Sequence, residues 1–222
     1  MITTVYLVRH GVTEWNVARR IAGRLPGIAL SADGRREAAA VASRLAALPI
    51  RAVAASPLER AHETAAAIAR AHGLAVAEDA SLTEREYVRW QGLFSAEIRA
   101  RDPDAVDAVA RGDDVPGIEP VGAMAERMWD GMERLVGGHP GGALVIVSHA
   151  DPIRALIARI IGMPPARLRA IEIGTASLSR LRRRDSSAVV DFANSRAHLG
   201  GPLGTDSSSG TDQGRPAARP LS

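Results

Sequence analysis

The feature that most restricts the fold of this chain is the alternation of short apolar runs with longer amphipathic stretches. The runs Ile2 to Val8, Arg51 to Ala55 and Ala143 to Val147 are strand-like, and the last is purely apolar, as in strands buried on both faces. The stretches with the apolar spacing of helices are residues 35–48, 57–72, 122–136 and 151–161. This alternation predicts an α/β fold with a mainly parallel sheet between helices.

Several boundaries have local signals. Ser31 precedes a helical pattern, and Gly73 follows one. The segment Ser56-Pro57-Leu58-Glu59 combines an N-cap serine, a proline at the first helical position and a glutamate spaced for a capping box, so it predicts a helix from Pro57. The shorter apolar runs that predict further strands are Leu74 to Ala77, Ala170 to Ile173, Ser177 to Arg182 and Ala188 to Phe192.

The length and composition predict one domain with a tail. With 222 residues and 46% hydrophobic content, the chain can bury one substantial core, which we assign to residues 1–198. From residue 199 to residue 222 the composition changes to Gly, Pro, Ser, Thr and Asp. Such a segment cannot bury enough apolar surface to offset its chain entropy, so we expect it to be disordered.

Composition also excludes several classes of protein. The chain has no cysteine, so it has neither disulfides nor thiolate metal sites. It lacks an apolar run of membrane-spanning length and a signal-peptide pattern, so we expect a cytoplasmic protein that does not contact membranes. Arginine supplies all 28 basic charges, but these are spread over the chain and aromatic residues make up only 3%, so we expect no nucleic-acid partner.

The first strand is followed at once by Arg9, His10 and Gly11. Arginine offers a planar fork of donors suited to phosphate or carboxylate, and histidine can act as base, acid or nucleophile near neutral pH. Gly11 lets the backbone turn sharply or approach a ligand. In parallel α/β sheets ligands collect beyond the carboxyl ends of the strands, so this placement favours a site.

Two more strands are followed by residues that suit an anion. Ser56 and Arg60 follow the second, and Ser148 and His149 follow the last parallel run, just before a helix. If these strands are neighbours, their ends share one crevice, where helix N-termini add donors and partial positive charge. The loop that carries Glu84 could reach the same rim. These residue types suit phosphoryl transfer through a covalent histidine, without a metal or cofactor.

Four blocks of sequence resemble the histidine phosphatase superfamily, which includes the cofactor-dependent phosphoglycerate mutases and many small phosphatases. In chain order they are Leu7 to Gly11, Ala55 to Ala65, Leu82 to Glu84 with Trp90 to Gly92, and Val147 to His149 with Pro152 to Arg154. The resemblance implies a phosphoglycerate mutase-like fold, a three-layer α/β/α sandwich with a mainly parallel mixed sheet. It also leaves a homodimer open, because members of the superfamily are often dimers.

The resemblance implies a role for each matching residue. His10 is the phosphorylated nucleophile, Arg9 and Arg60 bind the phosphoryl group with His149, and Glu84 is the general acid. Neutral imidazole must attack, so one ring nitrogen of His10 should donate to a backbone carbonyl while the other attacks. Glu84 would protonate the leaving oxygen and then take a proton from the attacking water.

Four further positions are assigned to substrate or phosphate binding: Gly11, Asn16, Gly23 and Ala150. Ala150 stands where the family usually has glycine and can supply only a backbone N–H. Residues 23–27 also depart from the commoner family pattern, and Arg24 there is a candidate contact at the rim of the site.

We expect a phosphoric monoester hydrolase that acts on a small phosphorylated metabolite. The chief alternative is a phosphoglycerate mutase or related phosphomutase, which returns the phosphoryl group to substrate. The segment between Glu84 and His149 is shorter than in the resembling mutases, which favours a site open to water. A third reading, a binding module without turnover, is disfavoured because His10 and Glu84 are both present.

Overall fold

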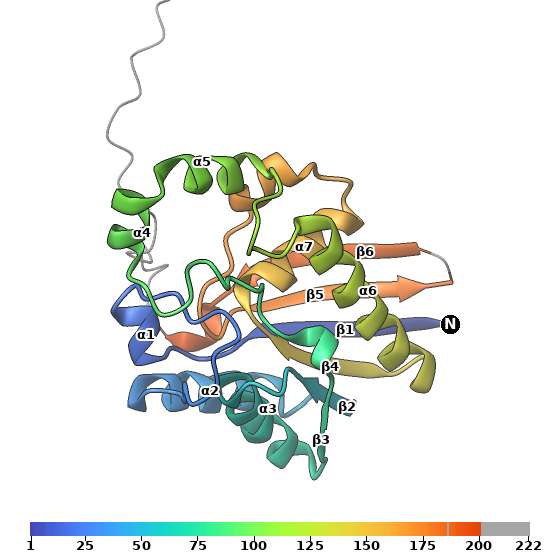
Figure 1. Ribbon diagram of the computed structural model, residues 1–222. Helices are drawn as coiled ribbons and strands as arrows, with labels where there is room; N and C mark the ends of the chain where they lie inside the picture. Colours follow the sequence, from blue (N-terminus) through green and yellow to red (C-terminus); the bar gives the residue numbers. More distant parts are fainter. Residues whose placement is uncertain (186, 201–222) are drawn as a thin grey trace, which may run out of the picture.

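The computed structural model describes residues 1–185 and 187–200. Within them, the strands form one sheet in the order β3-β2-β4-β1-β5-β6 (Figure 1). The strands are β1 (Ile2–Arg9), β2 (Ile50–Ala55), β3 (Val76–Glu78), β4 (Ala143–Ser148), β5 (Leu178–Arg184) and β6 (Ser187–Ser195). β1 to β4 are parallel to one another, and β5 and β6 form an antiparallel hairpin beside β1. The predicted mainly parallel, mixed sheet is confirmed.

Helices cover both faces of this sheet. The helices are α1 (Glu14–Val17), α2 (Ala32–Leu45), α3 (Glu59–His72), α4 (Ser95–Arg101), α5 (Pro103–Arg111), α6 (Val121–Gly138) and α7 (Ala150–Ile160). The described residues also form the 3₁₀ turns η1 (Ala80–Leu82), η2 (Pro165–Ala170) and η3 (Ala197–Leu199). Helices α2 and α3 pack on one face and α6 and α7 on the other, which gives the predicted three-layer sandwich (Figure 1).

The core follows from side-chain alternation along the central strands. On β1, Tyr6 and Val8 pack with α2 and α3, whereas Val5 and Leu7 pack with α6 and α7. Successive side chains of a strand point to opposite faces, so each strand contributes to both cores. A smaller cluster around Trp90 joins residues of α4, α5 and the preceding loop. Figure 1 shows α1 and α4 beyond the end of the sheet where β1 ends.

Two local predictions are wrong. Helix α3 begins at Glu59 rather than Pro57, and Ser56 does not cap it, because residue 58 occupies the N-cap position without a side-chain hydrogen bond. In the predicted strand Ala170 to Ile173, Ala170 instead ends the 3₁₀ turn η2, and the run pairs with no strand of the described residues. Its carbonyl groups accept from arginine side chains: Arg154 Nε donates to Ile171 at 2.8 Å and Arg9 Nη1 to Ile173 at 2.7 Å.

The predicted disordered tail falls mostly outside the described residues. Of it, the structure describes only Leu199, which ends η3, and Gly200. In the described parts of the chain, every helix is too short or too polar to cross a membrane.

Candidate active site

The three predicted turns lie together at the carboxyl edge of the sheet. Strands β2, β4 and β1 are neighbours, and their ends are linked by backbone hydrogen bonds. The N–H of Ser56 donates to the carbonyl of Val147 at 3.1 Å, and the N–H of His10 donates to that of Ser148 at 3.0 Å. The residues that follow the three strands therefore share one crevice.

His10 is buried, and its ring is fixed by one hydrogen bond. Nδ1 lies 2.7 Å from the carbonyl oxygen of Gly11. A carbonyl can only accept, so Nδ1 carries the proton and Nε2 of the neutral ring holds a free electron pair. Burial, reinforced by the charges of Arg60 and Arg9, holds the pKa of His10 well below its ordinary value. The expected hydrogen bond is present, and it leaves Nε2 as the nucleophilic nitrogen.

His149 lies edge-on to His10, with the ring centroids 5.1 Å apart. Its Nε2 lies 2.9 Å from the hydroxyl oxygen of Ser56, which already accepts from the backbone N–H of Leu58 at 3.3 Å. A serine hydroxyl can donate or accept, and in the tautomer where it donates to Nε2 the proton of neutral His149 lies on Nδ1. Burial, followed by the charge of Arg60, lowers the pKa of His149 well below its ordinary value. Nδ1 is buried and has no hydrogen-bond partner within the described residues.

Arg60 brings a buried positive charge to the same crevice from the first turn of α3. Only 2% of the residue is exposed. Its Nη2 donates to the carbonyl of Gly23 at 2.9 Å, while Nη1 is buried and has no partner in the part of the chain that the structure describes. Burial lowers the pKa of Arg60, and the carboxylates of Glu84 and Glu59 oppose that shift. A buried cation with an unused donor suits an anionic ligand.

Arg9 is anchored at the end of β1 by the hydrogen bond from Nη1 to the carbonyl of Ile173, at 2.7 Å. Its positive charge lowers the pKa of both His10 and His149, as does that of Arg60. The two arginines therefore produce a positive potential around the two imidazole rings. Together with burial, which lowers the pKa of each ring most, that potential keeps the rings neutral in the free protein, and it attracts a phosphoryl group.

Glu84 lies in the loop after η1, where Oε1 accepts from the backbone N–H of Arg85 at 2.8 Å. Burial, and after it the negative charge of Asp151, raise the pKa of Glu84 to about 7, against the opposing effect of Arg60 and Arg9. Near neutral pH this carboxyl group can therefore both give and take a proton, as a general acid and base must. The raised pKa that the predicted role requires is present despite the nearby arginines.

Asp151 is the ionised partner of that pair. Burial alone would raise its pKa, but the guanidinium groups of Arg154 and Arg169 lower it below its ordinary value. The hydroxyl of Tyr87 donates to one carboxylate oxygen, and Arg154 Nη1 donates to the other at 2.8 Å. Its negative charge is thus fixed near Glu84.

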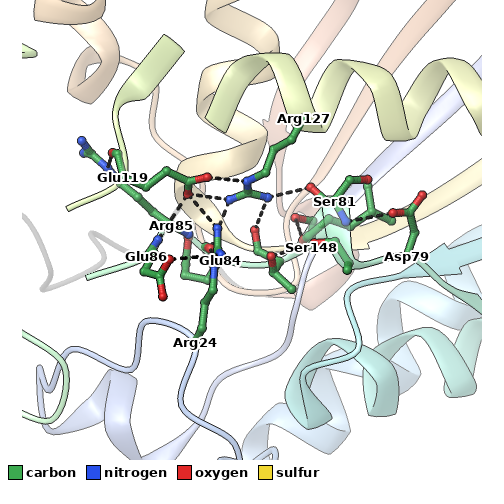
Figure 2. A network of polar contacts seen from close by, with 12 residues as sticks. Arg24, Asp79, Ser81, Glu84, Arg85, Glu86, Glu119, Arg127 and Ser148 are labelled. Atoms are coloured by element: carbon green, nitrogen blue, oxygen red, sulfur yellow. Dashed lines mark hydrogen bonds and ion pairs between the residues drawn. The ribbon is translucent and has the colours of Figure 1, made fainter. Parts of the chain in front are cut away.

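The loop that carries Glu84 is held by a network of arginine contacts (Figure 2). Arg127 of α6 donates to the carbonyls of Ser81 at 2.6 Å, Thr83 at 2.7 Å and Glu84 at 3.1 Å, and it forms an ion pair with Glu119 at 2.6 Å. These bonds hold the loop against α6.

Arg24 belongs to the same network. Its Nε donates to the carbonyl of Glu84 at 2.9 Å, and its other nitrogens pair with Glu86 at 3.4 Å and Glu119 at 3.0 Å (Figure 2). The guanidinium is therefore bound to the loop that carries Glu84, and its expected contact at the rim of the site stays a prediction.

The remaining predicted site residues differ in which of their polar groups are already hydrogen-bonded. Gly11 donates its N–H to Thr64 Oγ1 at 3.1 Å and accepts from His10, so it has no unused backbone donor. Asn16 Oδ1 accepts from the N–H of Thr13 at 3.0 Å, so the predicted substrate contact would come from its Nδ2 group. Gly23 orients Arg60 through its carbonyl. Ala150 is the first residue of α7, and its contact with phosphate stays a prediction.

Sequence reasoning missed Arg127, Asp151 and Tyr87. Arg127 and Tyr87 are placed by tertiary contacts that no local pattern signals, whereas an acidic residue in the first turn of α7 could have marked Asp151. In the described residues no three His, Asp or Glu side chains are grouped as metal ligands.

The chain is similar in sequence to known proteins. The family model of the histidine phosphatase superfamily (branch 1) matches residues 5–196. A bifunctional protein of Mycobacterium tuberculosis, Rv2228c, is 36% identical over 89% of this chain, which spans only 55% of that protein's length. The probable phosphoglycerate mutase GpmB of Serratia proteamaculans is 32% identical over 89% of this chain and 95% of its own.

Two further relatives have phosphatase names. The metal-independent phosphoserine phosphatase of Arabidopsis thaliana is 33% identical over 89% of this chain and 84% of its own. The solved structure of a mycobacterial glucosyl-3-phosphoglycerate phosphatase, Rv2419c, in complex with VO3, superposes with a TM-score of 0.80. It is 31% identical and covers 86% of this chain and 98% of its own.

Proposed function

The chain belongs to the histidine phosphatase superfamily (branch 1), and from that premise we propose that it is a metal-independent phosphatase. Its substrate is a small phosphomonoester, and the intermediate is a phosphohistidine at His10. One observation carries the proposal: the free Nε2 of His10 shares a crevice with two buried nitrogens, Nη1 of Arg60 and Nδ1 of His149, that have no partner among the described residues. Buried polar groups without partners are rare and fit a ligand that supplies them.

The proposed reaction has two steps. Nε2 of His10 attacks phosphorus, and the ester oxygen leaves with the proton of Glu84. Water then attacks the phosphohistidine and gives its proton to Glu84, which releases inorganic phosphate and restores both groups. Arg60, Arg9 and His149 stabilise the negative oxygens in both steps, which is the larger part of catalysis in phosphoryl transfer.

A mutase uses the same residues but returns the phosphoryl group to substrate. The resemblance to GpmB proteins supports this second candidate. The short segment between Glu84 and His149 favours hydrolysis, because a less enclosed site admits water. The names of the Arabidopsis relative and of the mycobacterial solved structure also support a phosphatase. A binding module without turnover is the third alternative. A cytoplasmic location and a homodimer stay proposals.

The first test is release of phosphate from p-nitrophenyl phosphate in EDTA by the wild type and by His10→Ala, with His62→Ala as the matched control. His62 lies on α3 with its side chain 42% exposed, outside the crevice. We expect EDTA-resistant hydrolysis that His10→Ala abolishes and His62→Ala leaves intact. Mutase turnover of 3-phosphoglycerate with little hydrolysis would move the assignment to the mutase, and failure of every activity would favour the binding module.

A further inference from the structure

The peptide group between Gly11 and Val12 forms hydrogen bonds on both of its sides. Its carbonyl accepts from Nδ1 of His10 at 2.7 Å, and its N–H donates to Oε2 of Glu37 at 2.8 Å. The described residues contain no cis peptide bond, so the carbonyl and the N–H of this peptide point in opposite directions. We propose that Glu37 is a positioning residue for His10, acting through this peptide; the inference rests on the proposed function.

Glu37 is itself held in place on α2. Its Oε1 accepts from the hydroxyl of Thr175 at 3.0 Å, and Arg196 Nη2 lies 3.8 Å from the same oxygen. The side chain is 18% exposed, and Thr175 is buried. The carboxylate is thus fixed by contacts from the loop after η2 and from the end of β6, and it can fix the peptide in turn.

The peptides on either side of this one are bound by other groups. The N–H of Gly11 donates to Thr64 Oγ1 at 3.1 Å, and the carbonyl of Val12 accepts from the N–H of Ser31 at 3.0 Å. Both groups belong to the neighbouring peptides. Within the described residues, Glu37 is the partner that fixes the orientation of the Gly11 carbonyl from behind.

The orientation of that carbonyl matters to the chemistry. When Nε2 of His10 bonds to phosphorus, the ring keeps its Nδ1 proton and gains positive charge. The Gly11 carbonyl stabilises this charge, and a carboxylate on the opposite side polarises the peptide and strengthens the bond. The hydrogen bond also selects the tautomer in which Nε2 is free to attack.

Three consequences distinguish a positioning role from a purely structural one. Glu37→Ala lowers kcat for p-nitrophenyl phosphate by roughly tenfold to a hundredfold, with KM changed much less, because the loss falls on the nucleophile and not on the phosphate ligands. Glu37→Gln keeps an acceptor for the Val12 N–H and recovers most of kcat. His10 also loses its preference for the Nδ1–H tautomer in the alanine variant.

The matched controls are Glu63→Ala and Glu63→Gln. Glu63 also accepts a backbone N–H, that of Leu30 at 3.3 Å, and pairs with Arg35 at 3.2 Å, but it has no contact with the peptide beside His10. We expect both variants to keep the wild-type kcat and the wild-type tautomer. Equal losses at Glu63 and Glu37 would overturn the proposal.

The tautomer is read from long-range ¹H–¹⁵N spectra of the full chain labelled at histidine, with His10 assigned by His10→Gln. This readout separates the two proposals, because it needs no turnover. If the wild type hydrolyses nothing, the proposed phosphatase fails, and the tautomer shift still decides the role of Glu37. An active wild type with unchanged kcat and tautomer in Glu37→Ala overturns the role of Glu37 and leaves the phosphatase standing. Should Glu37→Ala fail to fold, Glu37→Asp, which draws the carboxylate back from Val12, makes the same test.

Discussion

The guanidinium of Arg127 donates a hydrogen bond to the backbone carbonyl of Glu84 at 3.1 Å, so the candidate acid is held from helix α6 as well as by its own loop (Figure 2). Most of this arginine is buried, with its side chain 19% exposed, and its ion pair with Glu119 satisfies the charge. An arginine that binds three carbonyls within four residues of a loop, those of Ser81, Thr83 and Glu84, fixes the loop's shape as well as its place.

Arg127→Ala is expected to weaken proton donation by Glu84. Hydrolysis of alkyl phosphomonoesters should fall by about tenfold or more, because an alkoxide leaves poorly without a proton, whereas p-nitrophenyl phosphate should lose less. Loss of one partner of a largely buried ion pair should also lower the free energy of unfolding by about 3 kcal/mol. Parallel kcat measurements on the two substrate types check the first effect.

Arg134→Ala is the control for that variant. Arg134 lies on the same helix and binds Asp79 at 2.9 Å, but its side chain is 58% exposed and it does not touch Glu84. Its loss should leave unchanged the ratio of kcat for alkyl phosphomonoesters to kcat for p-nitrophenyl phosphate. An equal change of the ratio in both variants would contradict a specific role for Arg127.

The pKa of Glu84, raised to about 7 by burial and by Asp151, predicts a pH dependence. The acid must be protonated to act, so kcat/KM for an alkyl phosphomonoester should fall as the pH rises through about 7. Asp151→Asn removes a negative charge that raises this pKa, so the fall should move to lower pH. Asp130→Asn, an exposed acid of α6, should leave the profile in place. Measurements of kcat/KM against pH on the three proteins test this prediction. A profile that Asp151→Asn leaves unmoved would show that burial alone raises the pKa of Glu84.

The sequence was sufficient to predict the mainly parallel sheet between helices and the residues that come after its strands. His10 and His149 each follow a strand directly, and Arg60 lies in the first turn of the helix after another strand. Parallel neighbours bring such positions to one edge of a sheet whatever the details of packing. The family model that covers residues 5–196 confirms the resemblance from which their roles were taken. The roles themselves stay predictions.

Local sequence patterns gave wrong predictions where a residue far away in the sequence forms a hydrogen bond with the polar group. Ser56 has the sequence of an N-cap, but His149, 93 positions away, lies against its hydroxyl. The carbonyls of Ile171 and Ile173 accept from Arg154 and Arg9 in place of a strand partner, so a β-like run remains outside the sheet. No spacing rule identifies which of the arginines is buried against a carbonyl, and Arg127 could not be singled out for that reason.

Two glycines allow the loop after His10 to approach the start of α2. A Cβ built on Gly34 would lie 2.0 Å from the carbonyl oxygen of Val12, and one built on Gly11 would lie 2.4 Å from that of Gly34. Gly34→Ala must therefore displace backbone, and we expect it to lower the free energy of unfolding by about 2 kcal/mol or more. Because Val12 would move, kcat should fall as well.

Gly122→Ala provides the contrast for this substitution. Gly122 lies exposed within α6, and a Cβ there would meet no atom within 4 Å. Alanine should stabilise the helix at that position by up to about 1 kcal/mol. Urea denaturation of both variants measures the difference, and a Gly34→Ala protein as stable as the wild type would mean that the close approach can relax.

The buried charge of Arg60 predicts a trade between binding and stability. Arg60 is 2% exposed, burial lowers its pKa, and its Nη1 has no partner in the described part of the chain. Desolvation of this cation therefore destabilises the free protein. Phosphate or vanadate should supply that partner and raise the Tm of the wild type.

Arg60→Met keeps the volume of the side chain without the charge, so it should abolish the anion-dependent rise in Tm while leaving the anion-free protein as stable or more stable. Arg70→Met, at an exposed position of the same helix, should keep the full rise. Thermal melts of the three proteins over a phosphate series make the measurement; a full phosphate shift in Arg60→Met would place the anion elsewhere on the molecule.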